Sequence, residues 1–139
     1  MTLTRDLAAD LDEVQSIAPQ ALTDGTVNGT SADMQGFESG AALLDVGLYT
    51  DGTHTATVQD SADDVTFAAL AAADVSSVSG PNTVHPIVVD SATNEDNVTY
   101  LVGFAATVER YVRWSIVTAS STTGAVIGAL IVRGHARHL

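Results

Sequence analysis

The chain has 139 residues, enough for one domain with its own hydrophobic core. It contains no cysteine, which excludes disulfides and cysteine-ligated zinc or iron–sulfur sites. Seventeen acidic residues face five arginines and no lysine, giving a net charge of −12, so we expect no nucleic-acid partner.

The same charge balance has two interpretations. One is an acidic domain kept apart from its neighbours by like charge. The other, which we favour, is adaptation to very high salt, where screening removes the repulsion and lysine becomes scarce. No apolar stretch approaches the roughly 20 residues that span a bilayer. The first residues also lack the pattern of a signal peptide, so we expect assembly in the cytoplasm without a membrane partner.

Residues 1–19 are expected to form an arm outside the β core. Leu7, Leu11 and Val14 recur at spacings of four and three, as on one face of a short helix capped by Thr4. The alternative is an extended arm whose apolar residues contact a partner.

Residues 20–134 alternate short apolar runs with turns, the pattern of an all-β sandwich, jelly-roll-like fold or barrel. Residues 39–49 and 53–59 each have period-two alternation and flank an Asp-Gly turn, so we expect an antiparallel hairpin. The inward faces would consist of Ala42, Leu44, Val46 and Leu48 on the first run and His54, Ala56 and Val58 on the second.

The middle of the chain is less regular. We expect a short strand at 65–67, a loop with one helical turn at 68–74, and a loop at 75–83. Residues 84–89 should form an edge strand, because Pro86 cannot donate to a central ladder. Residues 98–106 alternate again and predict a core strand.

Residues 109–133 predict a second hairpin, with Trp114 buried between Val112 and Ile116. Its second run, 125–132, is apolar on both faces, so both faces should be buried. The core of the domain buries one face. The other would be buried by the N-terminal segment, a loop or another copy of the chain. We expect a homo-oligomer, with interface residues Tyr111, Arg113, Ile127, Ala129 and Ile131.

Reactive groups are sparse. His135 and His138 have a spacing that could hold a metal, but we expect residues 135–139 to form a tail that contacts a neighbouring subunit. The acidic run at 60–64 could bind calcium, but it lacks the spacing of a calcium loop and is interpreted as a solvated turn. No nucleophile–base arrangement or phosphate loop is present. We therefore expect no enzymatic activity, cofactor or metal.

Three stretches carry a family resemblance: QGFES at 35–39; DGTHT at 51–55 with QDS at 59–61; and RYVR at 110–113, before a threonine-rich turn. Together they resemble small β-rich structural proteins encoded near the major capsid protein in tailed phages and archaeal tailed viruses. The resemblance spans about residues 14–135. The chain departs from the pattern at 63–64, where no glycine follows the acidic turn, and at 68–81, which is lengthened.

The resemblance implies a virion protein that decorates or stabilises the capsid, as a turret or cement protein. The composition would place its host among halophilic archaea. Implied partners are the major capsid protein and further copies of the chain, as trimers or pentamers. The alternative is a receptor- or carbohydrate-binding β-sandwich of a spike or tail. Such modules usually expose aromatic residues, whereas this chain has one Trp and three Tyr.

Overall fold

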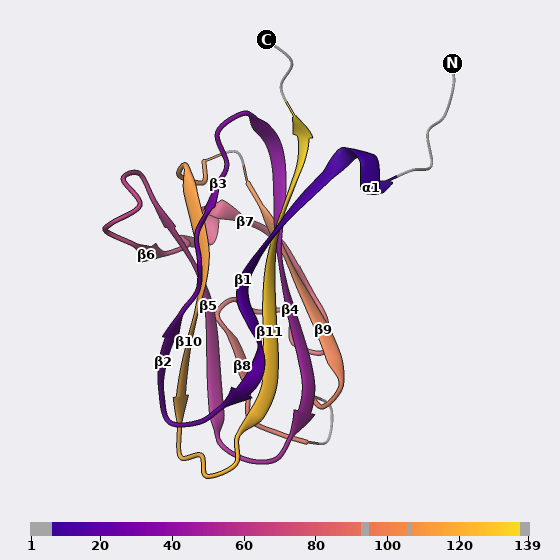
Figure 1. Cartoon of the computed structure of the whole chain (residues 1–139), viewed down its shortest axis with the longest axis vertical. Helices are drawn as coiled ribbons and strands as arrows, with labels where there is room; N and C mark the ends of the chain where they lie inside the picture. Colours follow the sequence, from indigo (N-terminus) through magenta and orange to yellow (C-terminus); the bar gives the residue numbers. More distant parts are fainter. Residues whose placement is uncertain (1–6, 93–94, 106, 137–139) are drawn as a thin grey trace.

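A computed structural model describes residues 7–92, 95–105 and 107–136. Two antiparallel β-sheets face each other as a sandwich, preceded by one short helix, α1 (Leu7–Asp10) (Figure 1). The predicted all-β sandwich is confirmed, and within the described residues the sheets do not close into a barrel.

The five-stranded sheet has the order β1 (Leu11–Leu22), β11 (Ala125–Ala136), β4 (Phe37–Tyr49), β9 (Val98–Phe104) and β7 (Val75–Ser79). The six-stranded sheet runs β2 (Gly25–Asn28), β10 (Tyr111–Ala119), β5 (Thr53–Ser61) and β6 (Ala68–Ala69); β3 (Ala32–Asp33) also pairs with β10, and β8 (Ile87–Val89) with β5. A 3₁₀ turn, Ala72–Asp74, precedes β7.

The core lies between the sheets, where alternate residues of the central strands meet. Trp114 is fully buried, as predicted, and its Nε1–H donates to the Leu130 carbonyl oxygen of the opposite sheet at 3.1 Å. His54 is also fully buried: its Nε2 lies 3.0 Å from the Asp51 carbonyl oxygen and its Nδ1 2.9 Å from Thr118 Oγ1. Because a carbonyl only accepts, Nε2 carries a hydrogen and donates it to Asp51.

Both predicted hairpins are wrong in their pairing. β4 and β5 lie in different sheets, and so do β10 and β11. Each pair is an arch that crosses the sandwich, so its two apolar faces oppose each other rather than lie side by side. The two arches pair with one another instead, β4 with β11 and β5 with β10.

The Asp51 carboxylate joins the turns of the two arches. It accepts hydrogen bonds from the backbone N–H groups of Thr122, Thr123 and Gly124 and from the Ser121 hydroxyl. These bonds favour the ionised carboxyl and lower the pKa of Asp51. The Asp-Gly turn, expected only to connect two strands of a hairpin, is therefore a structural joint between the two arches.

The N-terminal segment agrees with the prediction in part: α1 is the expected short helix, whereas the residues that follow it do not lie outside the β core. Residues 11–22 form an edge strand of the five-stranded sheet, with register shifts around Ser16 and Pro19. Ser16 turns inward, accepting a hydrogen bond from the Trp114 N–H and donating to the Thr30 carbonyl oxygen, so it ties this edge to the other sheet. The Pro19 ring lies over Gly128, so the N-terminal segment covers part of the second face of β11.

The remaining elements differ from prediction in detail. Residues 65–67 are not a strand, whereas residues 75–79, expected as loop, form β7. Leu48 points outward and is 61% exposed, because the pairing of β4 with β11 shifts by one residue between Val46 and Tyr49. At the other end of the chain, β11 continues to Ala136, two residues into the expected tail.

His85 makes the stability of the β5 edge depend on pH. Its Nε2 accepts a hydrogen bond from the Val58 N–H at 2.8 Å, and burial lowers the pKa of His85 below 6.5. Because the folded pKa is the lower one, the stabilisation is complete above pH 6.5 and is lost as pH falls through the folded pKa. We expect the Tm to fall over this range.

His85→Gln is the matched control, since its side-chain oxygen can accept the same bond without titrating. Its Tm should fall less than that of the wild type over the same pH interval, in melts followed by circular dichroism. Parallel curves for the two proteins would contradict this role.

Candidate functional site

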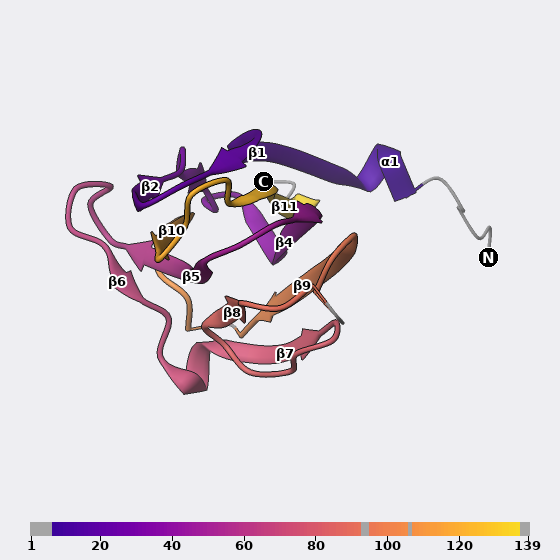
Figure 2. The ribbon, with the colours of Figure 1, turned by 90° about the horizontal axis from the view of Figure 1, so that it is seen from below.

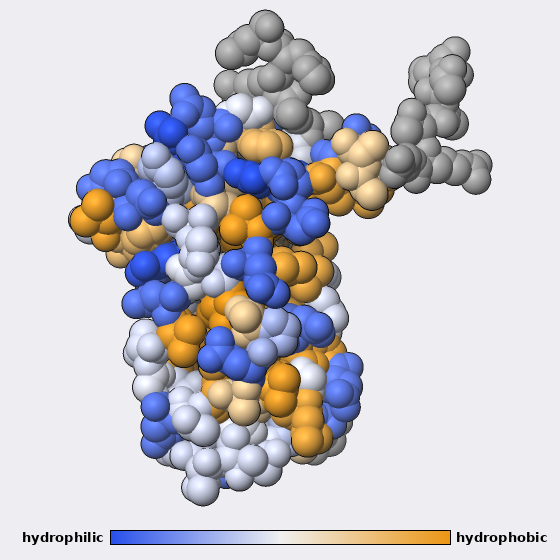
Figure 3. Space-filling model, viewed as in Figure 1, coloured by the Kyte–Doolittle hydropathy of each residue, from blue (hydrophilic) through white to orange (hydrophobic). Residues whose placement is uncertain are grey.

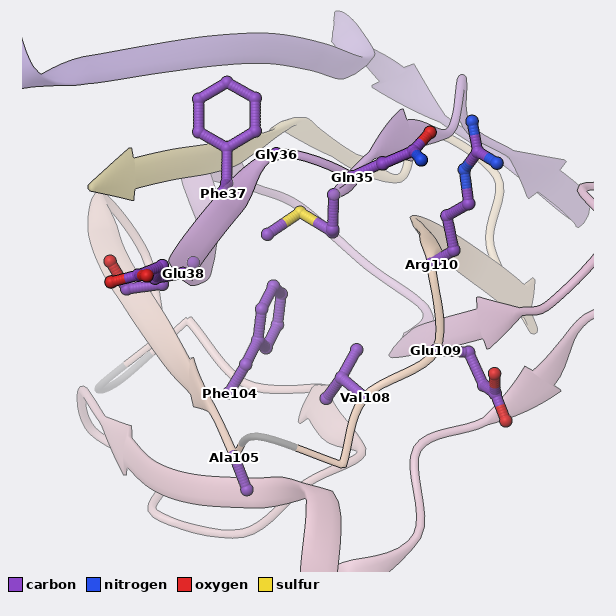
Figure 4. Close-up of a pocket in the computed structure, with 12 residues that line it drawn as sticks. Gln35, Gly36, Phe37, Glu38, Phe104, Ala105, Val108, Glu109 and Arg110 are labelled. Atoms are coloured by element: carbon purple, nitrogen blue, oxygen red, sulfur yellow. The ribbon is translucent and has the colours of Figure 1, made fainter. Parts of the chain in front are cut away.

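A pocket of about 440 Å³ opens at the end of the sandwich where β4 begins and β9 ends (Figure 4). Its lining is mixed: Met34, Phe104 and Val108 form an apolar part, and polar residues such as Gln35 and Arg110 complete the wall. Figure 4 shows the side chains of Phe104 and Val108 pointing into the same space, whereas the Glu109 carboxylate points away. A Cβ at Gly40 would lie 2.5 Å from Met34 Cε and 3.0 Å from Phe104 Cδ2, so the glycine makes room for both side chains.

Asp33 fixes the loop that forms one wall of this pocket. Its carboxylate accepts from Arg110 Nε at 2.9 Å and Nη2 at 2.8 Å, and from the backbone N–H of Gln35. The Asp33 carbonyl oxygen accepts from Arg133 Nη1, and the Arg133 guanidinium lies over the Phe37 ring. Arg133 also pairs with Asp12 of β1. Both arginines are therefore used to hold the pocket wall.

We expect Asp33→Asn to weaken the fold in a pH-dependent way. Hydrogen bonding to Arg110 is the main cause that lowers the pKa of Asp33 from 3.8 to about 2. The pair therefore stabilises fully above pH 3.8, and its contribution is lost as pH falls through about 2. The Arg110 and Asp33 side chains are 44% and 40% exposed, so screening limits the effect to about 1 kcal/mol or less.

Urea unfolding of the wild type and the variant across this pH range would measure the difference. Asp45→Asn, which removes the same charge at an exposed position of β4, serves as the control. If the deficit of Asp33→Asn stayed constant down to about pH 2, the ion pair would not be its source.

The predicted interface residues do not come together. Ile127, Ala129 and Ile131 are buried in the core of a single chain, which corrects their assignment to an interface. They belong to the inward face of β11, because β11 is a central strand and its odd-numbered residues point at the opposite sheet. Tyr111 and Arg113 lie on the outer face of the other sheet, where Arg113 donates to Gln59 Oε1 and lies over the Phe67 ring.

The other face of β11 carries the outward apolar residues that the sequence interpretation did not select. Leu130 pairs with Leu43 of β4, and Leu43 with Leu101 of β9, so three leucines form a row across the outer face of the five-stranded sheet. Leu101 is 41% exposed and Val126, farther along β11, is 39% exposed. In Figure 3, apolar patches lie between polar ones over β1, β11 and β4. We call Leu130, Leu43 and Leu101 the leucine row.

The other candidate groups are engaged locally. Asp63 accepts hydrogen bonds from the Ser61 hydroxyl and from the backbone of Val65 and Thr66, which lowers its pKa. The Asp60 carboxylate accepts from the Glu109 N–H. In the part of the chain that the structure describes, no three His, Asp or Glu side chains are placed to hold a metal. The His135/His138 pair falls outside the residues whose side chains are described.

No helix in the described ranges has the length and hydropathy needed to cross a bilayer. Comparison of the chain with models of protein families, with curated proteins and with solved structures found no significant match in any of the three.

Proposed function

We propose that this chain is a structural protein of a virion, a capsid-decorating or cement protein of a tailed virus of halophilic archaea, that works through packing surfaces and not through catalysis. The proposal draws on the resemblance of residues 14–135 to such proteins and on the surface of the sandwich. It includes self-association and binding to the major capsid protein.

The leucine row is the observation that carries the proposal. It lies on a regular sheet face in a chain whose net charge is −12. An exposed apolar patch with polar surroundings is typical of a protein–protein contact. Neighbouring outward positions are small or polar, such as Ala41, Gly103 and Thr99, so they leave the leucine side chains accessible to a partner. We assign this face to the capsid.

The alternative role in receptor or carbohydrate binding has less support. Trp114, the one tryptophan, is fully buried and hydrogen-bonded across the core. Tyr100 is buried as well. Two of the aromatic groups that could stack on a sugar are therefore committed to the core, and Tyr111, on an outer face, has the Arg110 guanidinium over its ring.

High salt should be required for full stability. Two arginine–carboxylate ion pairs form among the described residues, Arg110–Asp33 and Arg133–Asp12, and with 17 acidic residues against five arginines most carboxylates in the chain cannot be paired with an arginine. Lowering salt from about 1 M to about 0.1 M lengthens the Debye length from about 3 Å to about 10 Å and exposes their repulsion. We expect the Tm to fall on this change.

Differential scanning calorimetry in a chloride series would measure the effect. A parallel series in sucrose at low salt separates screening from osmolyte stabilisation, because sucrose is excluded from surfaces but does not screen charge. A Tm that is the same at both salt levels would remove the argument for a halophilic source.

The virion assignment is tested by mass spectrometry of virus particles released by the host that carries the gene. The chain should be present at a fixed ratio to the major capsid protein. A Leu43→Asp/Leu101→Asp variant should fold but no longer bind purified capsid shells, whereas Thr55→Asp/Thr57→Asp, on the outer face of the other sheet, should still bind. Absence from particles, or equal binding of the two variants, would overturn the proposal.

A further inference from the structure

The described chain begins with a segment that stands off the sandwich. α1 (Leu7–Asp10) buries none of its four residues, and Leu7 is 66% exposed. Figures 1 and 2 show the start of β1 carrying α1 beyond the body of the molecule. A single helical turn is too short to be stable by itself in water, so contact with a further surface would stabilise it.

The pocket lies at the same end of the molecule. β1 and β4 belong to one sheet, and Leu11 at the start of β1 pairs with Gly134 of β11, which pairs with Ser39 beside the pocket. The apolar part of the pocket, formed by Met34, Phe104 and Val108, is suited to an aliphatic side chain. The volume of the pocket is within the range of about 300–1,000 Å³ typical of ligand sites. Leu7 of the same chain is not among the lining residues.

We propose that α1 of one copy docks on a second copy of this chain and places Leu7 in the second copy's pocket, against Met34, Phe104 and Val108. This inference deepens the self-association in the proposed function and rests on it. The occupant is a second copy because Leu7 remains largely exposed in its own chain, although the pocket is nearby.

The geometry of this contact favours rings. The helix and the pocket are different surfaces, so the contact is heterologous, and repeating it generates a closed ring when the rotation between copies allows closure. Each copy would place its α1 on one neighbour and would bind the α1 of another neighbour at its own pocket. Because every copy carries a charge of −12, the contact should form at molar salt, where repulsion is screened.

The absence of cysteine allows a direct test by disulfide cross-linking. Leu7→Cys and Val108→Cys are made as separate proteins, mixed at molar salt and oxidised. A covalent dimer containing one chain of each kind is expected, because the two thiols meet only between copies. Leu48→Cys replaces Leu7→Cys as control: Leu48 is a similarly exposed leucine at the far end of β4, and it should give no mixed dimer with Val108→Cys.

The double variant Leu7→Cys/Val108→Cys then distinguishes the geometries. A ladder of covalent species ending at one size supports the ring and gives its number of subunits. A monomer with an internal disulfide would show that the arm folds onto its own pocket and would overturn the proposal. Absence of any cross-link, in proteins whose far-UV circular dichroism matches the wild type, would also overturn it.

A second measurement avoids engineered thiols. Leu7→Asp should run as a monomer in analytical ultracentrifugation at molar salt, and Leu48→Asp should retain the wild-type mass. If both retain it, the arm is not the contact. Such a failure leaves the presence of the chain in virions, which is measured separately, unaffected.

Discussion

Replacing Trp114 by alanine is expected to lower the free energy of unfolding by about 3–5 kcal/mol. The side chain is fully buried, fills the space between the two sheets and donates its Nε1–H to Leu130 of the opposite sheet. Its removal leaves a cavity that the paired strands on both sides cannot close. Urea unfolding followed by circular dichroism measures the loss, since the variant has no tryptophan.

Trp114→Phe separates the contribution of ring packing from that of the hydrogen bond, because phenylalanine keeps an aromatic ring in the core but lacks the N–H donor. Trp114→Phe should lower the free energy of unfolding by clearly less than Trp114→Ala does. In the wild type, the fluorescence of this single tryptophan should resist quenching by acrylamide. Ready quenching, or a loss below about 1 kcal/mol in Trp114→Ala, would contradict its burial between the sheets.

Replacing Gly124 by alanine is expected to cost more than about 3 kcal/mol or to prevent folding. Gly124 has φ +84°, and a Cβ built on it would overlap the carbonyl oxygen of Leu22 at the end of β1. The same residue donates its N–H to Asp51 and accepts at its carbonyl from Thr50. To remove the overlap, the end of β1 would have to move away from Gly124 and from the turns that Asp51 joins.

Gly36→Ala is a matched control, because Gly36 has nearly the same φ, +88°, but nothing lies within 4 Å of a Cβ there. The free energy of unfolding of Gly36→Ala should fall by only about 1–2 kcal/mol, the cost of a left-handed backbone conformation for alanine. The difference between the two variants therefore measures the steric overlap alone. Equal losses in thermal melts would show that Leu22 does not restrict this position.

Alternation along the strands predicted most of the residues that point into the core, although it failed for Leu48, which lies beyond a register shift. Ala42, Leu44 and Val46 are buried as predicted, and so are Trp114 and its neighbours. Alternation is the same for a hairpin and for an arch, however, because it records which side of a strand is apolar and not which strand lies beside it. The Asp51 joint, which stabilises the crossing, depends on residues some 70 positions apart.

The candidate site was less accessible to prediction for a related reason. The run 125–132 is apolar on both faces, and the choice between its two sets of residues needed the register with β4. The pocket is lined by residues from three separate segments, so no single stretch of the sequence predicts it. β1 was obscured because Ser16 and Pro19 interrupt its alternation, and each has a role only in the presence of a distant partner, Trp114 or Gly128.

The pairing of β1 with β11 has a consequence for biosynthesis. β11 is the last strand to be made, yet it lies between β1 and β4 and supplies Ile127 and Ile131 to the core. A nascent chain therefore cannot complete the five-stranded sheet until β11 has emerged from the ribosome. Because contacts between segments far apart in the sequence are slow to form, completion of this sheet should limit the rate of folding.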